Sequence, residues 1–303
     1  MFNTYRRGLF ITAFLAAPVT LYLVYVISPY AQAFYIAMTD WRGVTATPNF
    51  VGLDNFVRLF SDGVFWKAVT HNAALLVLLP LVTIVIALFF AFLLNVGSEG
   101  RGVGGVAGSK FYRVLFFFPQ VLAVTVVAVL FQQVFRPDGS GMLNGPLMAL
   151  GARPVGFLSD PDVAFWSVLG VMVWQAVGFY VVLFSAGLAS IPRDMFEAAQ
   201  IDGAGRVSLF FRITLPLLWD TVQVAWVYLG ILAMDVFAIV WVMTDQHGGP
   251  DFSTTVMATE IYRNAFQHFR FGYASALGVV MFFFTIGFAI LSLRLSRRER
   301  IEY

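Results

Sequence analysis

Six long apolar runs divide this chain of 303 residues, and they constrain its fold more than any other feature. Each run is rich in Leu, Val and Phe and approaches or exceeds the roughly 20 residues that an α-helix needs to cross a membrane. The composition agrees, because 59% of the residues are hydrophobic and 12% are charged, which is too apolar for an ordinary water-soluble protein. We therefore predict an all-α, polytopic membrane protein with six spans, at about 9–30, 73–96, 114–135, 164–190, 217–243 and 273–293.

The first apolar run follows Arg6 and Arg7, an arrangement that a cleavable signal peptide shares. The apolar core of a signal peptide has about 7 to 15 residues, whereas this run continues to Ile27. We therefore expect an uncleaved first span. No linker or low-complexity tract separates a soluble domain, so residues 1–303 are predicted to form a single integral-membrane domain.

The distribution of basic residues predicts the orientation of the spans, because Lys and Arg favour cytoplasmic loops. With both termini in the cytoplasm, the cytoplasmic segments would hold twelve of the nineteen basic residues: Arg6, Arg7, Arg101, Lys110, Arg113, Arg193, Arg206, Arg212, Arg294, Arg297, Arg298 and Arg300. The other seven are spread over longer external loops. We therefore expect both termini on the cytoplasmic side of the membrane.

Several functional classes lack support in the sequence. A net charge of +2 without a long basic run gives no indication of nucleic-acid binding. The chain has no cysteine, and His71, His247 and His268 lack metal-ligand spacing, so no metal site is expected. The sequence contains neither a carboxylate pair suited to acid and base catalysis nor a nucleophile motif, so it predicts no catalytic residues.

The glycine-rich loop at 102–110 superficially resembles a phosphate-binding loop. In that motif Lys precedes Ser or Thr and the loop joins a strand to a helix, whereas here Ser109 precedes Lys110 between two spans. We expect no ATP, magnesium or other cofactor on this chain.

The loop between the fourth and fifth spans, residues 191–216, is the most informative segment. Asp194 and Glu197 have the spacing of a capping box, and Gly203 can end a helix in the left-handed conformation. A second helical piece should run from Arg206 to Pro216, which breaks it at the membrane.

A short Ala-rich helix on a cytoplasmic loop lets another protein approach closely, and Arg193 and Glu197 could pair across such a contact. A well-capped loop helix without any partner is the alternative. The spacing of this loop matches the EAA motif of binding-protein-dependent ABC importer permeases: Glu197-Ala198-Ala199, three residues, Gly203, nine residues, Ile213, one residue and Leu215-Pro216.

The fuller form of the motif, with Asp202-Gly203-Ala204, is similar to that of the maltose and glycerol-phosphate permeases. The resemblance implies the type I ABC importer permease fold, with a coupling helix that sits in a cleft of an ATPase subunit. It assigns the coupling to Arg193, Glu197, Ala198, Ala199, Asp202, Gly203 and Ala204.

Further segments along nearly the whole chain resemble, more weakly, the first permease of the maltose system. They include Gly52-Leu53-Asp54-Asn55-Phe56, Gly141-Met142-Leu143-Asn144 and Gly272-Tyr273-Ala274-Ser275-Ala276. The resemblance implies a permease of a bacterial plasma membrane with a carbohydrate substrate. It also implies a second and different permease subunit, two ATPase subunits that bind ATP and magnesium, and an extracytoplasmic sugar-binding protein.

Two helical stripes are candidates for the substrate pathway, because a sugar site needs polar groups for hydroxyls and aromatic faces for the ring. Tyr228, Leu232 and Asp235 share one face of the fifth span, and Met172, Gln175 and Phe179 share a face of the fourth. Asp235 should face protein or water, since an unpaired charge in lipid costs a few kcal/mol. Packing between helices is the alternative role for both stripes.

Two other classes of function remain as alternatives. An ion-coupled secondary transporter or channel predicts paired intramembrane charges, broken helices or an inverted repeat, and the lone Asp235 meets this poorly. An integral membrane enzyme predicts clustered His, Asp or Glu at one interface. Neither class explains the spacing of the EAA motif.

Overall fold

A computed structural model describes residues 2–44, 47–95 and 108–295. The glycines at 102–105 and the C-terminal arginines Arg297, Arg298 and Arg300 lie outside these ranges. The described chain is helical and contains no β-strand, only one isolated antiparallel bridge between Thr39 and Phe50. It forms two compact units, one from Met1–Phe65 with Glu260–Phe283 and one from Trp66–Thr259 with Phe284–Tyr303. We call them unit 1 and unit 2.

Four described helices are long and apolar enough to cross a membrane: Arg6–Ala37, Gly63–Asn95, Pro161–Ala189 and Phe271–Arg294. Two helix pairs also qualify within the described residues, each sharply bent at a short break. Counting each bent pair as one span gives six spans, the number predicted, although the second pair, Arg206–Met234, begins and ends earlier than the predicted span 217–243. The first two helices are longer than the predicted spans 9–30 and 73–96.

Unit 1 contains helices from both ends of the chain. They are α1 (Phe2–Tyr22), the π-helical η1 (Leu23–Ile27), α2 (Ser28–Ala37), α3 (Asp54–Ser61), the π-helical η5 (Arg263–Gln267) and the first half of α15 (Phe271–Leu295). Ring contacts join α2 to α15, with the Tyr30 and Phe282 centroids 5.2 Å apart. The side-chain amide of Asn55 donates to the carbonyl groups of Ala37 and Thr39, at 2.9 and 2.8 Å, and so fixes α3 to the end of α2.

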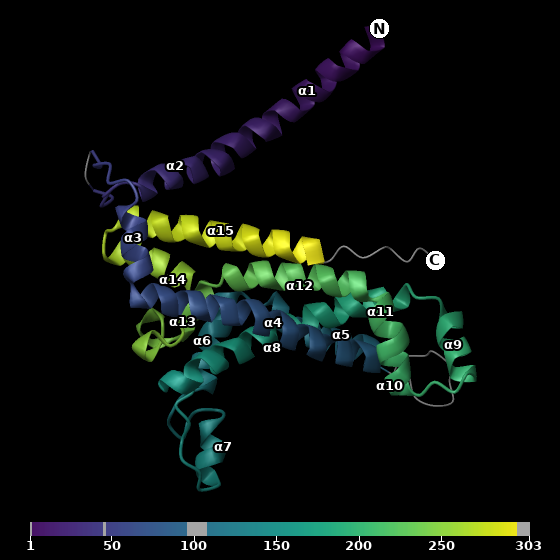
Figure 1. The fold of residues 1–303 in the computed structure, drawn as a ribbon. Helices are drawn as coiled ribbons and strands as arrows, with labels where there is room; N and C mark the ends of the chain where they lie inside the picture. The colour runs from purple at the N-terminus through teal and green to yellow at the C-terminus, as the bar shows by residue number, and fades with distance from the viewer. Residues whose placement is uncertain (1, 45–46, 96–107, 296–303) are drawn as a thin grey trace. The chain divides into compact units, whose positions relative to one another are not determined.

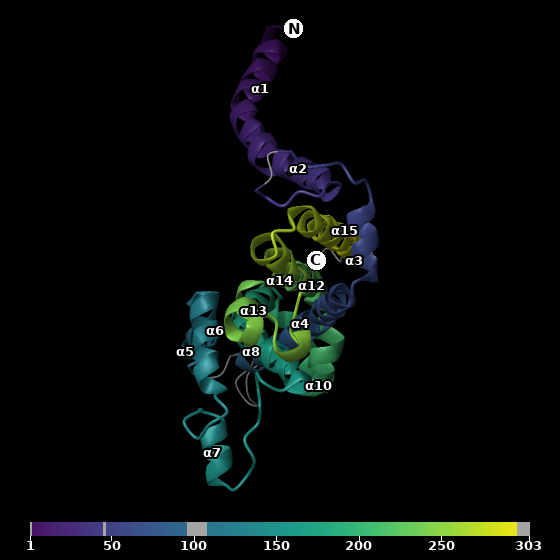
Figure 2. The same ribbon diagram turned by 90° about the vertical axis from the view of Figure 1, so that its left-hand side faces the viewer.

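Unit 2 contains most of α4 (Gly63–Asn95), the following elements up to Thr259 and the second half of α15. Figures 1 and 2 label many of these helices. The elements that follow α4 are α5 (Ser109–Val121), α6 (Val124–Val134), α7 (Asn144–Ala149), α8 (Pro161–Ala189), α9 (Arg193–Ile201), α10 (Arg206–Leu209), η2 (Phe210–Thr214), α11 (Leu215–Leu217), α12 (Trp219–Met234), α13 (Ala238–Met243), η3 (Asp245–His247), η4 (Pro250–Phe252) and the start of α14 (Met257–Tyr262). Helix α5 packs along α8, and α6 packs along α13.

The core of unit 2 lies around the middle of α8, where Val181 and Phe184 are fully buried. Leu79 of α4 and Leu229 of α12 belong to the same buried cluster. The long helices have apolar side chains all around, which is typical of spans that contact protein on one side and lipid on the other. The apolar surface that the core leaves uncovered is therefore expected to contact lipid or partner subunits.

The third predicted span, 114–135, is not one continuous helix. Helices α5 and α6 meet at 97° across Leu122 and Ala123, which have extended backbone conformations. Pro119 lies in the last turn of α5 and cannot donate a backbone hydrogen bond, so it weakens the helix just before the break.

The fifth predicted span, 217–243, is also divided. A bend of 70° at Leu218 separates the segment Arg206–Leu217 from α12. Helix α12 then ends at Met234, and α13 begins at Ala238. Asp235 therefore lies at the end of a helix and not within one, which corrects the sequence-based expectation.

Candidate functional site

Helix α9 forms the centre of the predicted coupling loop, and its first turn differs from the prediction. The N-cap residue is Pro192, whose side chain cannot cap the helix, and Asp194 lies inside the first turn. The predicted capping box of Asp194 and Glu197 is therefore wrong. Asp194 still stabilises the helix, because a negative charge in the first turn interacts favourably with the helix dipole.

The C-terminal end of α9 confirms the predicted role of Gly203. This residue has a φ of +80°, and its N–H donates to the carbonyl of Gln200 at 3.0 Å. The N–H of Ala204 donates to the carbonyl of Ala199 at 2.9 Å. Together these bonds form a Schellman motif, which closes the helix tightly and favours glycine at the left-handed position.

Helix α9 has one buried and one exposed face. The Phe196 side chain is only 2% exposed and belongs to the core cluster of unit 2, and Ala199 packs beside it. Glu197 and Ala198 are exposed, and the Ile201 side chain is 86% exposed. The helix is thus anchored in unit 2 while it presents a small, partly apolar surface outward.

The remaining predicted coupling residues continue this exposed surface. Asp202 and Gly203 are exposed and Ala204 is half-buried. Arg193 begins α9, but its side chain is outside the described part of the structure, so its predicted pairing remains untested. Glu197 has no hydrogen bond or ion pair within the described residues.

The segment after α9 connects the loop firmly to the spans. Leu209 of α10 and Leu218 after α11 are both buried in the core cluster. The ring of Phe210 lies 5.1 Å from that of Phe92 in α4. Pro216 does not stop the helix at once, because it stands at the start of α11, where its missing N–H is tolerated. Figure 1 shows α9 and α10 beside the junction of α11 with α12.

A second candidate site is a cavity of about 470 Å³ within unit 2. Five of the six residues that the sequence placed on the substrate pathway line it: Met172, Gln175, Tyr228, Leu232 and Asp235. Phe179 does not; its ring lies against that of Tyr180, 5.2 Å between centroids. The two predicted stripes, from α8 and α12, therefore face a common space.

Two polar or aromatic residues of this cavity were missed by the sequence analysis. Gln120 comes from the end of α5, and Phe237 from the irregular segment after α12. Gln120 directly follows Pro119, and a polar residue next to a proline inside an apolar run was the available signal. Phe237 had no comparable signal, because its position depends on the end of α12.

The two polar side chains from the predicted stripes differ in their bonding. Gln175 donates its amide to the carbonyl of Leu122 at 3.2 Å, which satisfies a backbone group at the break between α5 and α6. The Asp235 side chain is exposed and has no hydrogen-bond partner among the described residues. Gln175 therefore supports the fold, whereas the carboxylate of Asp235 is available for a ligand, water or another subunit.

Comparison with known proteins places this arrangement in a family. Residues 100–301 match the model of the binding-protein-dependent transport system inner membrane component family. The chain is 41% identical to the diacetylchitobiose uptake system permease protein NgcF of Streptomyces coelicolor, over 97% of this chain and 84% of that protein. It is 30% identical to the multiple sugar-binding transport system permease protein MsmF of Streptococcus mutans, over 95% of each chain.

The fold also matches a solved structure. A chain of a bacterial ABC transporter involved in the import of alginate superposes with a TM-score of 0.83, at 23% identity and over 98% of both chains. This likeness shows the type I importer fold, and the matching family model and relatives show the family. The chain belongs to the binding-protein-dependent transport system inner membrane component family and is a permease of an ABC importer.

Proposed function

We propose that this permease transports a carbohydrate, delivered by an extracytoplasmic binding protein, through the cavity between α8 and α12. The observation that carries the proposal is the convergence of Gln120, Tyr228, Asp235 and Phe237 on that cavity. Amide and carboxylate groups can bind sugar hydroxyls, and an aromatic ring can cover the apolar face of the sugar. Relatives named for diacetylchitobiose and multiple-sugar uptake support the same substrate class.

The broken helices explain how a polar pathway can exist in an apolar chain. Backbone groups at the breaks after Val121 and Met234 cannot all form regular helical hydrogen bonds, and such backbone is tolerated where it borders protein or a water-filled cavity. The cavity includes residues beside both breaks, namely Gln120, Val124 and Asp235. A site of this construction would bind a polar solute weakly and release it when the helices move.

We propose that α9 transmits the closing of an ATPase subunit to the spans. Its exposed Glu197, Ala198 and Ile201 form a surface small enough to enter a cleft in the partner, while Phe196 holds the helix in unit 2. Two separate ATPase subunits would bind ATP and magnesium. The ATP-bound state must then favour one of two conformations of the spans, since a ligand shifts an equilibrium only through differential binding.

We further propose that a second permease completes the pathway and that both termini are cytoplasmic. Asp235 and Tyr228 are exposed in the isolated chain, as expected if another subunit closes the cavity. With six spans, the loop that contains α9 lies on the same side of the membrane as the termini. That side must be cytoplasmic if α9 contacts the ATPase.

Reconstitution with the second permease, the ATPase subunits and candidate binding proteins tests the proposal. We expect ATP hydrolysis to rise when a binding protein loaded with a mono-, di- or oligosaccharide is added, and labelled sugar to enter the vesicles. Stimulation only by an amino acid or ion receptor would contradict the carbohydrate assignment. A matched Asp235→Asn complex separates the cavity from the coupling loop, because it should transport less sugar and retain binding-protein-stimulated hydrolysis.

A further inference from the structure

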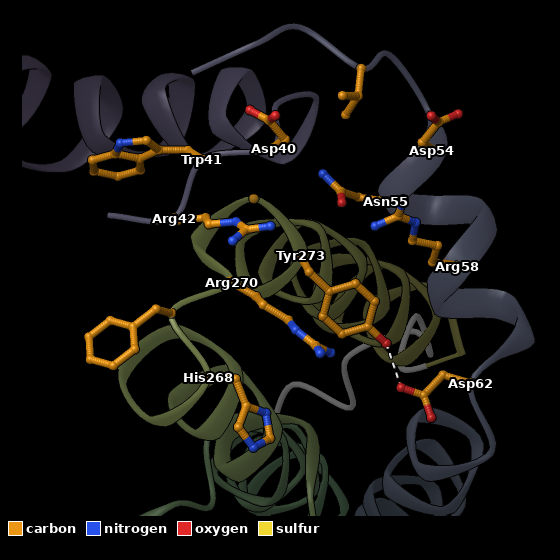
Figure 3. A pocket seen from close by; sticks show the side chains of 13 residues that line it. Asp40, Trp41, Arg42, Asp54, Asn55, Arg58, Asp62, His268, Arg270 and Tyr273 are labelled. Atoms are coloured by element: carbon orange, nitrogen blue, oxygen red, sulfur yellow. Dashed lines mark hydrogen bonds between the residues drawn. The ribbon is translucent and has the colours of Figure 1, made fainter. Parts of the chain in front are cut away.

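Unit 1 contains a charged pocket of about 630 Å³ to which no role has been assigned (Figure 3). Its lining comes from three segments that are distant in the sequence. These are the residues after α2, including Asp40 and Arg42, the polar face of α3, and the turn that leads into α15 at Arg270. All of them belong to unit 1.

The local packing that forms this pocket is tight. The backbone of Gly272 lies against the carbonyl of Thr39, so closely that any side chain at Gly272 would collide with it. The N–H of Gly272 also donates to the carbonyl of Trp41 at 3.0 Å. The segment after α2 is thereby held against the start of α15, and the pocket has defined walls.

Two of the three carboxylates in the pocket are already bound within the chain. Asp40 accepts hydrogen bonds from the N–H and side-chain amide of Asn49, at 2.8 and 3.0 Å. These bonds, with a smaller contribution from the charge of Arg42, hold the pKa of Asp40 below its usual value. Asp62 accepts from the Tyr273 hydroxyl at 2.7 Å and from the N–H of Val64 at 2.8 Å.

The arginines of the pocket, unlike these two carboxylates, have no hydrogen-bond or ion-pair partner within the described residues. Arg42, Arg58 and Arg270 are exposed, and none has a hydrogen bond or ion pair within the described residues. Arg263 of the same unit differs, since it is buried and pairs with Glu260. Figure 3 shows the Arg42 and Arg270 side chains directed toward the space around Tyr273. The three guanidinium groups are thus available as donors, and a guanidinium group binds a carboxylate with two parallel hydrogen bonds.

An apolar rim lies beside these charges. Val57 and Phe60 of α3 and its N-cap residue Leu53 are exposed, and Phe269 is exposed in the turn before α15. Charged groups beside a cluster of exposed apolar side chains are typical of a protein-binding surface. A dissolved sugar or inorganic anion would use the arginines but leave the rim in water.

We propose that this pocket is a docking point for the extracytoplasmic binding protein, in which an acidic side chain of that protein places its carboxylate among Arg42, Arg58 and Arg270. The inference rests on the proposed function, because the pocket is on the binding-protein side only if α9 is cytoplasmic. Along the chain, one span (Arg6–Ala37) precedes the pocket residues that follow α2, and another (Phe271–Arg294) begins directly after Arg270. Counting spans from cytoplasmic termini therefore assigns the pocket to the extracytoplasmic side.

The test uses the full transporter, this chain with its partner permease and ATPase subunits, in nanodiscs of phosphatidylcholine. The affinity of the sugar-loaded binding protein is measured by biolayer interferometry at several salt concentrations, together with the ATP hydrolysis that it stimulates. Arg42→Gln and Arg270→Gln should each weaken binding about tenfold and reduce its dependence on salt. Hydrolysis at saturating binding protein should be unchanged.

Arg153→Gln is the matched control, because Arg153 is also exposed but lies outside the pocket. Arg270→Lys should give an intermediate affinity, since lysine retains the charge but not the bidentate geometry. Comparable yield and melting temperature of each complex exclude misfolding as the cause of a loss.

Three results would overturn the proposal. The pocket variants could bind as tightly, and with the same salt dependence, as Arg153→Gln. Their defect could occur only in nanodiscs that contain anionic phospholipid, which would assign the arginines to a lipid headgroup. Free uronic acid could bind the wild-type complex but not the Arg270→Gln complex, which would assign the arginines to an acidic sugar. If no sugar-loaded binding protein stimulates the wild type, the proposed function itself fails, and the docking point fails with it.

Discussion

The backbone of Gly178 in α8 lies directly against the carbonyl group of Phe116 in α5. A Cβ atom at position 178 would overlap that carbonyl, so only glycine permits this approach. Small residues allow close packing of membrane helices, where van der Waals contact replaces the hydrophobic effect as the driving force. The contact fixes the position of α5 just before its break and thus one wall of the cavity.

Gly178→Ala should lower stability by about 1–3 kcal/mol, because the added methyl group forces α5 and α8 apart. Thermal unfolding of the purified chain in detergent measures the effect. The matched control is Gly170→Ala on the same helix, where a Cβ meets no atom within 4 Å. Equal melting temperatures for the two variants would contradict the proposed close packing.

Glu197→Lys should abolish ATP-dependent uptake while the subunit still inserts and folds, because the Glu197 side chain is exposed and has no partner within the described residues. Uptake in vesicles and the yield of assembled complex are the two measurements. Asp245→Lys makes the same charge change at another exposed position and should leave uptake intact. Unchanged uptake in Glu197→Lys would disprove the coupling role.

Phe196→Ala should destabilise the coupling loop by about 3–5 kcal/mol, the usual range for removing a buried phenyl ring. We expect faster hydrogen exchange in 193–209 and hydrolysis that no longer drives uptake. Ile201→Ala is the informative comparison, because Ile201 is exposed: it should keep native exchange rates but bind the ATPase more weakly. Slow exchange in Phe196→Ala would show that other contacts hold α9.

Asp235→Asn should leave the melting temperature unchanged and reduce sugar transport, since the carboxylate has no partner to lose within the described chain. Gln175→Leu should instead lower stability by about 1–3 kcal/mol, because it leaves the carbonyl of Leu122 without its hydrogen bond. If both variants are destabilised equally, helix packing is the role of Asp235.

Labelling of single cysteines can test the orientation, because the chain has no native cysteine. In intact cells a membrane-impermeant maleimide should label Ser61→Cys and spare Asp202→Cys, although both positions are exposed. Disruption of the membrane should make both reactive. The reverse pattern would place α9 outside the cytoplasm and refute the assignment of the ATPase side.

Local patterns in the sequence predicted the features that depend on neighbouring residues. The apolar runs predicted the spans, and Gly203 predicted the end of α9. The EAA spacing led to the ABC importer family, so a secondary transporter, channel or membrane enzyme is the wrong class. Each of these signals is contained within a short stretch of chain.

Other features were not predicted, most of them because they depend on tertiary contacts. Helical spacing predicted that Phe179 lies on the same face of α8 as Gln175, yet Phe179 does not line the cavity. How far the cavity extends along α8 depends on where α5 and α12 end. The capping box at Asp194 failed because Pro192 already directs the chain into the helix, with an N-cap φ of −56° and ψ of 134°. The arginine pocket of unit 1 joins residues more than 200 positions apart, and no local pattern connects them.

The anchorage of α9 has a mechanical consequence. If a flexible loop connected α9 to the spans, a displacement of α9 would change the loop conformation and would not move the spans. In this protein Phe196, Leu209 and Leu218 are all buried in one core. The Schellman motif restricts the backbone conformation between α9 and α10. A rigid loop of this kind would pass a displacement of Ile201 to the spans, which is what the proposed coupling to an ATPase subunit requires.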